Sequence, residues 1–179
     1  MSNYTIYHLH SDQSNPSSGT GADSVTKFDQ YLDRAKEEGM KNFAFSEHGT
    51  VSNWIKKKDE TEKRGMKYIH ANEVYLTEHK DKERGFIRDN YHYMMIAKNF
   101  DGVQELNKLT SDSWHRSDGG FYYNPRISFD ELKSTSDNII MTSACLASPL
   151  WRMYKRDKHK QLQDMLDFMG KNKHRMFFE

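Results

Sequence analysis

The chain has 179 residues, a formal net charge of +1 and a single cysteine. This length suits one ordinary domain with a core and is short for two. The near-neutral charge excludes a strongly basic nucleic-acid coat, and the lone cysteine excludes an internal disulfide and fits a reducing cytoplasm. No apolar stretch approaches the ~18 residues of a membrane span, and the first residues do not resemble a secretion signal, so we expect a cytoplasmic protein with no membrane partner.

Strands and helices are predicted to alternate through the first half of the chain, because apolar runs are separated by Gly-, Ser- and Asn-containing turns. We expect, in order, a strand over 4–10, a loop over 11–21, a helix from an N-cap at Ser24 to a stop at Gly39, a strand over 42–46, a helix over 51–63, and a strand over 68–71 that 73–76 extends or follows.

The second half continues the alternation after a highly charged segment. We expect a solvated loop over 78–89, a strand over 91–97, a helix over 100–109, an aromatic loop over 119–126, a short helix, a strand over 138–142, two helical segments within 150–170, and a strand from Arg175 onward. Such alternation favours a parallel sheet or a barrel of βα units. In these folds the chemistry lies where strands end and loops begin.

His8 and His10 are the strongest functional signal. On a strand, residues i and i+2 point to the same face, so the two imidazoles would form half of a metal site. His48 comes directly after the next predicted strand and is positioned to complete it. The pattern predicts a metal centre at the carboxyl ends of the strands.

Four further polar residues fall at the same expected rim: Asp23, Glu73, His92 and Cys145. A mixture of His, Asp, Glu and Cys suits zinc or manganese, and a carboxylate can bridge two ions. Each residue also has a structural alternative, such as a helix cap for Asp23 or a packed strand histidine for His92. We interpret the remaining histidines as surface or packing residues, namely His70, His79, His115, His159 and His174.

Six segments carry a resemblance to a known family: Tyr7–Ser11, Phe43–Gly49, Gly65–Tyr75, Tyr91–Lys98, Gly120–Ile127 and Ser143–Ala147. Together they resemble the PHP (polymerase and histidinol phosphatase) domain. More narrowly, they resemble the N-terminal PHP domain of bacterial-type DNA polymerase III alpha subunits, in a form such as phages carry. The Phe-Tyr-Tyr-x-Pro-Arg tract followed by Ser-Ala-Cys-Leu-Ala is specific to the polymerase branch.

The resemblance implies an α/β fold, a seven-stranded, TIM-like β/α barrel of the PHP type, as one domain over residues 1–179. It also implies a cofactor of up to three divalent metal ions, zinc or manganese, at the carboxyl rim. The matching ligands are His8, His10, Asp23, His48, Glu73, His92 and Cys145. Glu73 would be the bridging carboxylate and, with His10, the residue closest to catalysis. Asp12 is an alternative to Asp23, because the loop ahead of Asp23 is longer than in the family.

The sequence departs from the family pattern at two places. Glu47-His48-Gly49 stands where the family has Asp-His-Gly, and we expect Glu47 to orient a ligand. The family's last ligands form an Asp-x-His motif well downstream of the cysteine, and the given sequence stops before that point. The resemblance therefore implies a barrel incomplete at its C-terminal end, as in a truncated chain or a split or interrupted polymerase.

The implied function is metal-dependent phosphoesterase or 3′–5′ exonuclease chemistry within a DNA-directed DNA polymerase. The expected partners are DNA, other replisome subunits and the remainder of a split polymerase. Two alternatives stay open: an inactive structural scaffold, and a free-standing phosphoesterase resembling histidinol phosphatases. Phe121, Tyr122 and Tyr123 are expected to pack in their loop, with stacking on nucleic acid as the alternative, and no nucleic-acid-binding residue is identified.

Overall fold

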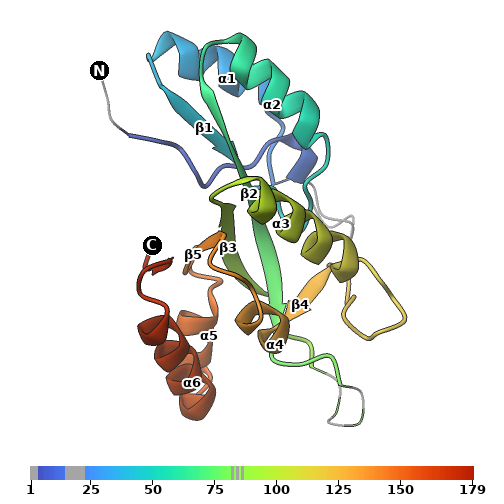
Figure 1. Ribbon diagram of the computed structural model, residues 1–179. Helices are drawn as coiled ribbons and strands as arrows, with labels where there is room; N and C mark the ends of the chain where they lie inside the picture. Colours follow the sequence, from blue (N-terminus) through green and yellow to red (C-terminus); the bar gives the residue numbers. More distant parts are fainter. Residues whose placement is uncertain (1–3, 15–22, 82, 84, 86) are drawn as a thin grey trace.

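The computed structural model describes residues 4–14, 23–81, 83, 85 and 87–179, which form a mixed α/β structure. Parts of the predicted loops over 11–21 and 78–89 lie outside the described residues. The described helices, which cover a central sheet (Figure 1), are a 3-10 turn η1 (Asp12–Ser14) and α1 (Phe28–Glu37), α2 (Trp54–Lys63), α3 (Phe100–Ser113), α4 (Phe129–Lys133), α5 (Pro149–Lys155) and α6 (His159–Lys171).

The described strands form one six-stranded sheet in the order β1-β2-β3-β5-β6, with β4 also paired to β2. The strands are β1 (Asn42–Phe45), β2 (Lys67–Thr77), β3 (Tyr91–Ala97), β4 (Arg126–Ser128), β5 (Ile139–Thr142) and β6 (Met176–Phe177). The long strand β2 crosses the middle of the molecule, with α1 and α2 toward one end and α5 and α6 toward the other (Figure 1). The predicted α/β class is confirmed.

The expected parallel pairing of strands is found in only part of the described sheet. Strands β1 and β4 run parallel to β2, and β6 runs parallel to β5, but β3 is antiparallel to both β2 and β5. The physical reason is the connection between β2 and β3. A parallel pair needs a crossover, usually a helix, and the charged segment between these strands contains no helix among its described residues.

The predicted strand over residues 4–10 is also wrong. The segment makes a single bridge to β1, between Ile6 and Phe43. Farther along, the Ser46 Oγ accepts a hydrogen bond from the Leu9 N–H at 2.9 Å, while the Ser46 N–H donates to the Leu9 carbonyl at 2.9 Å. A side-chain hydroxyl thus replaces the backbone group that would continue a regular ladder, and the segment lies along β1 without becoming a strand.

The first helix begins later than predicted. Lys27, not Ser24, is its N-cap, and α1 starts at Phe28. The Ser24 hydroxyl accepts a hydrogen bond from the Thr26 N–H at 3.2 Å, a local turn that competes with helix formation. Likewise α2 starts at Trp54, after Asn53 in a left-handed conformation. The aromatic loop ends in the short strand β4, which the sequence patterns did not predict.

The main core lies between β2, β3, β5 and the helices α3–α6, and a second apolar cluster lies between α1 and β1. The described part of the chain has no helix that is both long and apolar enough to cross a membrane. The middle of β2 carries a buried acidic residue, Glu73, which is 1% exposed. The fold thus places a carboxylate at the centre of the sheet.

Candidate metal centre

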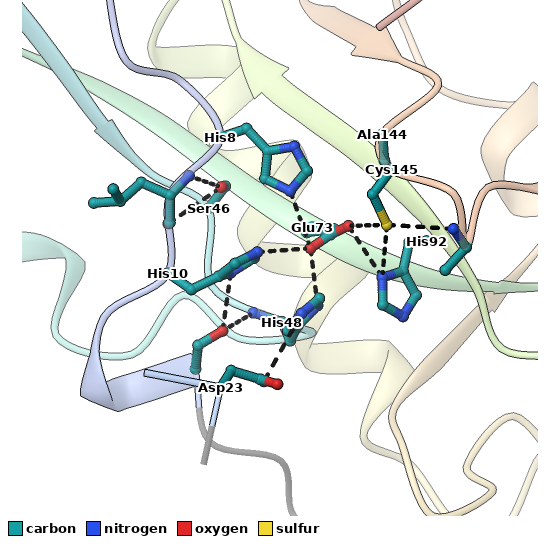
Figure 2. A network of polar contacts seen from close by, with 12 residues as sticks. His8, His10, Asp23, Ser46, His48, Glu73, His92, Ala144 and Cys145 are labelled. Carbon is teal, nitrogen blue, oxygen red and sulfur yellow. Dashed lines mark hydrogen bonds and ion pairs between the residues drawn. The ribbon is translucent and has the colours of Figure 1, made fainter. Parts of the chain in front are cut away.

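Glu73 on β2 is the centre of the cluster shown in Figure 2. Beyond the end of β1, His48 continues the parallel ladder by bridging to Glu73. On the other side of β2, His92 of β3 pairs with Tyr75, two residues from Glu73. Because side chains alternate along a strand, His92 and Glu73 share one face of the sheet. Two neighbouring strand segments therefore direct their histidines to the same carboxylate.

Four imidazoles surround Glu73. The Glu73 Oε2 atom lies 3.3 Å from His8 Nε2, 3.0 Å from His10 Nε2 and 2.9 Å from His48 Nδ1, and Oε1 lies 3.2 Å from His92 Nδ1. The rings also pack together, since His10 stacks on His48 with ring centroids 4.2 Å apart. Two groups of side chains could each hold a metal ion: His8, His10 and Glu73, and His48, Glu73 and His92. Within each group the potential ligand atoms lie within 4.8 Å of one another.

The segment that carries His8 and His10 is held by serine hydroxyls. Ser14 in η1 lies 3.1 Å from His10 Nδ1, and its Oγ accepts a hydrogen bond from the His48 N–H at 2.8 Å. One hydroxyl therefore joins the first and second histidine segments. Ser14 was not among the residues expected at the site, although its spacing of four residues from His10 could have indicated a contact.

Asp23 and Cys145 lie at opposite sides of this cluster (Figure 2). The Asp23 Oδ2 atom is 3.8 Å from His48 Nε2, and the Cys145 Sγ atom is 3.5 Å from His92 Nδ1 and 3.8 Å from Glu73 Oε1. Burial is the main cause of a raised pKa of the Cys145 thiol. Its thiolate would therefore need a cation nearby.

Glu179 is a member of the cluster that the sequence patterns did not indicate as a functional residue. Its Oε1 atom lies 2.7 Å from His8 Nδ1. No local motif signals this contact, because the two residues are 171 positions apart in the sequence. It becomes apparent only when β6 is placed beside β5.

The electrostatics follow from this crowding of imidazoles and carboxylates. Burial alone would raise the pKa of the Glu73 carboxyl, but contacts with the four imidazoles outweigh burial and hold that pKa well below its usual range. Burial alone would lower the pKa of His8, but its hydrogen bond to Glu179 and its contact with the Glu73 carboxylate raise that pKa to about 9.

The cluster fits a divalent metal for a geometric reason. Glu73 Oε2 and His48 Nδ1 are buried and 2.9 Å apart, yet neither makes a hydrogen bond of acceptable geometry. Three imidazole nitrogens converge on Glu73 Oε2 within 3.3 Å. Nitrogen and carboxylate donors that converge in this way match the ligand types of zinc and related ions.

The carboxylate of Glu47 is buried beside the cluster and bonded to other groups. Its oxygens accept hydrogen bonds from the Ser11 N–H at 2.9 Å and from Lys57 Nζ at 2.6 Å. Glu47 thus holds the residue that follows His10. Asp12, the alternative to Asp23, lines a separate cavity of about 400 Å³ together with residues of α1 and α2.

The other histidines and the aromatic tract lie apart from these contacts. His70 is buried against Asn107, while His159 and His174 have mostly exposed side chains. In the aromatic tract, Phe121 packs against Trp114 with ring centroids 5.9 Å apart, whereas Tyr123 is 63% exposed.

Comparison with known proteins relates this arrangement to a family. The PHP domain family model matches residues 7–179. DNA polymerase III subunit alpha of Borreliella burgdorferi is 34% identical over 155 residues, and that of Campylobacter jejuni is 32% identical over 146. These alignments cover 85% and 82% of this chain but 13% and 11% of the relatives, so the chain spans a small part of their length.

Among solved structures, an amidohydrolase from Chromobacterium violaceum with bound sulfate and no metal matches with a TM-score of 0.40 and 14% identity. That match covers 60% of this chain and 34% of the amidohydrolase. The family assignment rests on the family model and the curated relatives, which agree over most of the sequence. The chain belongs to the PHP domain family.

Proposed function

We propose that this chain is a metal-dependent phosphoesterase module that removes nucleotides from the 3′ end of DNA. The observation that carries the proposal is the position of Glu73. This buried carboxylate belongs to both groups of potential ligands, with His8 and His10 in one and His48 and His92 in the other. A carboxylate shared in this way suits a bridged pair of ions, an arrangement used to cleave phosphate esters.

In this proposal the side chains have separate roles. His8, His10 and Glu73 hold one divalent ion, and His48, Glu73 and His92 hold a second, with Asp23 and Cys145 as further ligands and zinc or manganese as the metal. Bound ions of this kind lower the pKa of a coordinated water toward ~7 and draw charge from a phosphate. Glu73 and His10 are the residues closest to the reacting atoms, and Glu47 positions His10 through Ser11.

The wider context of the proposal comes from the curated relatives, which are named DNA polymerase III subunit alpha. We place the chain in DNA replication in the cytoplasm, with DNA and other replisome subunits as partners. A third ion, and assembly with the remainder of a split polymerase, belong to the same proposal.

Metal content tests the centre directly. We expect the chain purified with Zn²⁺ or Mn²⁺ to carry bound metal in elemental analysis, and His8→Ala/His10→Ala to carry clearly less, because only the group of His48, Glu73 and His92 remains. His159→Ala is the matched control, because its side chain is 71% exposed and contacts the exposed Asp157 and not the cluster. Metal content that is unchanged in the double variant would show that the centre is wrongly placed.

Hydrolysis of a 3′-labelled single-stranded oligonucleotide tests the activity. We expect metal-dependent release of the 3′ nucleotide by the unmodified chain and by His159→Ala, and at least a 100-fold loss in Glu73→Gln, in keeping with removal of a group that acts on developing charge. Cleavage of p-nitrophenyl phosphate but not of DNA would instead support a free-standing phosphatase. Metal binding without either activity would support a structural scaffold.

A further inference from the structure

Glu179 is held by the last residue of β5 and by the residue after it. Its Oε2 atom accepts a hydrogen bond from the Thr142 hydroxyl at 2.5 Å, and its backbone N–H donates to the Ser143 hydroxyl at 2.9 Å. The other carboxylate oxygen, Oε1, is then directed at His8 Nδ1, 2.7 Å away. The carboxylate is thus anchored on one side and presented to a histidine on the other.

The two nitrogens of His8 have different partners. Nδ1 faces Glu179, while Nε2 faces Glu73 Oε2 at 3.3 Å. A histidine that ligates a metal through one nitrogen commonly donates its other N–H to a carboxylate, which fixes the ring and the tautomer. We propose that Glu179 is a positioning residue that holds the His8 ring with its proton on Nδ1, so that Nε2 can ligate a divalent cation beside Glu73.

This inference rests on the proposed metal centre and adds a residue that neither the family match nor the sequence patterns assign. In His10 and His48, the ring nitrogen that faces away from Glu73 has a weaker partner than His8 Nδ1 has. His10 Nδ1 lies 3.1 Å from a neutral hydroxyl, and His48 Nε2 lies 3.8 Å from the Asp23 carboxylate. Of these three histidines, His8 therefore depends most on a carboxylate for its orientation.

The test measures Zn²⁺ affinity of the purified chain by competition with a chromophoric chelator. We expect Glu179→Ala to weaken binding by about 10- to 100-fold. Glu179→Gln should retain most of the affinity, because its amide oxygen can still accept a hydrogen bond from the His8 Nδ1–H. Asp137→Asn is the matched control, since Asp137 makes an exposed carboxylate–histidine contact of 2.9 Å with His174. It should bind Zn²⁺ like the unmodified chain.

A double-mutant cycle separates positioning from a general loss of structure. If Glu179 acts through His8, Glu179→Ala should have little further effect on Zn²⁺ affinity in a His8→Ala background. An equal loss in both backgrounds, or no loss in either, would overturn the assignment. The proposed centre itself fails separately, if His8→Ala alone leaves Zn²⁺ affinity unchanged. The visible spectrum of the Co²⁺-loaded chain provides a second readout, which should change in Glu179→Ala and not in Asp137→Asn.

Discussion

His70 and Glu73 lie on the same strand, yet their side chains have unrelated environments. Side chains alternate along β2, so residues three apart face opposite sides of the sheet. His70 is 3% exposed and its ring contacts Asn107 and Tyr68, whereas Glu73 faces the candidate centre. Burial, which is the largest effect, and the nearby Lys57 lower the pKa of His70 to about 4. Its closeness to Glu73 in sequence therefore has no bearing on the metal centre.

The low pKa of His70 predicts acid destabilisation. The folded state keeps this ring neutral down to about pH 4, whereas the unfolded chain takes up the proton near pH 6.5. Between these values the unfolded state binds more protons, so the free energy of unfolding falls as the pH falls. We expect the loss due to His70 to reach on the order of 3 kcal/mol by pH 4. Urea unfolding of the unmodified chain and of His70→Gln over this pH range measures the loss. A free energy of unfolding that changes equally with pH in the two proteins would contradict the prediction.

Glu47 and Lys57 form a buried ion pair, and Glu47 also holds Ser11, the residue that follows His10. Their side chains are each 2% exposed and their charged atoms lie 2.6 Å apart. Lys57→Met should lower the free energy of unfolding by about 3–5 kcal/mol, because Glu47 would remain buried without its partner cation. The double variant Glu47→Leu/Lys57→Met should recover much of this loss in chemical denaturation. If the double variant is as unstable as the single one, the unpaired charge is not the cause.

At the scale of residues, sequence reasoning identified the candidates that follow strands but not the groups that hold them. His48, Glu73 and His92 could be predicted because apolar strands precede or surround them. Ser14 and Glu179 could not be predicted, because their roles depend on contacts between segments that no local pattern specifies. His8 and His10 lie near Glu73 although the strand expected to carry them does not form.

At the scale of elements, α3 packs closely on the sheet through Gly102, at the point where β3 ends and β5 begins. A Cβ atom at this position would lie 2.4 Å from the Asn138 carbonyl oxygen and 3.3 Å from the Ala97 Cα. We expect Gly102→Ala to lower the free energy of unfolding by about 1–3 kcal/mol, because the helix must move away from β5 and β3. Gly170→Ala in α6 is the control, since its Cβ would meet nothing within 4 Å.

The control variant should behave in the opposite way. Gly170→Ala should raise the free energy of unfolding by roughly 0.4–1 kcal/mol, through the lower conformational entropy of the unfolded chain. Thermal unfolding of both variants distinguishes packing from helix propensity. A stabilised Gly102→Ala would show that α3 does not lie as close to the sheet as described.

The elements that sequence patterns predicted well are those with strong local signals. Strand β3 spans the predicted residues 91–97, and α5 and α6 fill the predicted helical region. The direction of strand pairing was predicted wrongly, because periodicity reports which face is buried and not which neighbour lies beside a strand. The short strand β4 was missed because three residues beside a proline give no usable pattern.

At the scale of the whole molecule, the candidate centre joins distant parts of the chain. Its members come from the N-terminal segment, the ends of β1 and β5, the middle of β2 and the start of β3. His8 lies in the segment beside β1, and Glu179 follows β6. Their contact therefore joins the first and last strands of the strand order. A cation at this point would add a further connection between β1, β2, β3 and the segment after β5, which a small apolar cluster of Ala44, Ala71, Met94 and Ala144 also joins.

Metal binding should therefore stabilise the entire fold. At a free Zn²⁺ concentration of about 100 times the dissociation constant, one site that exists only in the folded state adds roughly 2.7 kcal/mol. For a chain of this size, this corresponds to a rise in melting temperature of roughly 5–10 °C. The chelator EDTA should reverse the rise, and His159→Ala should show it in full. His8→Ala/His10→Ala should show much less of it, because the first group of ligands then retains only Glu73. A Zn²⁺-induced shift as large in the double variant as in the unmodified chain would mean that the stabilising ion binds elsewhere.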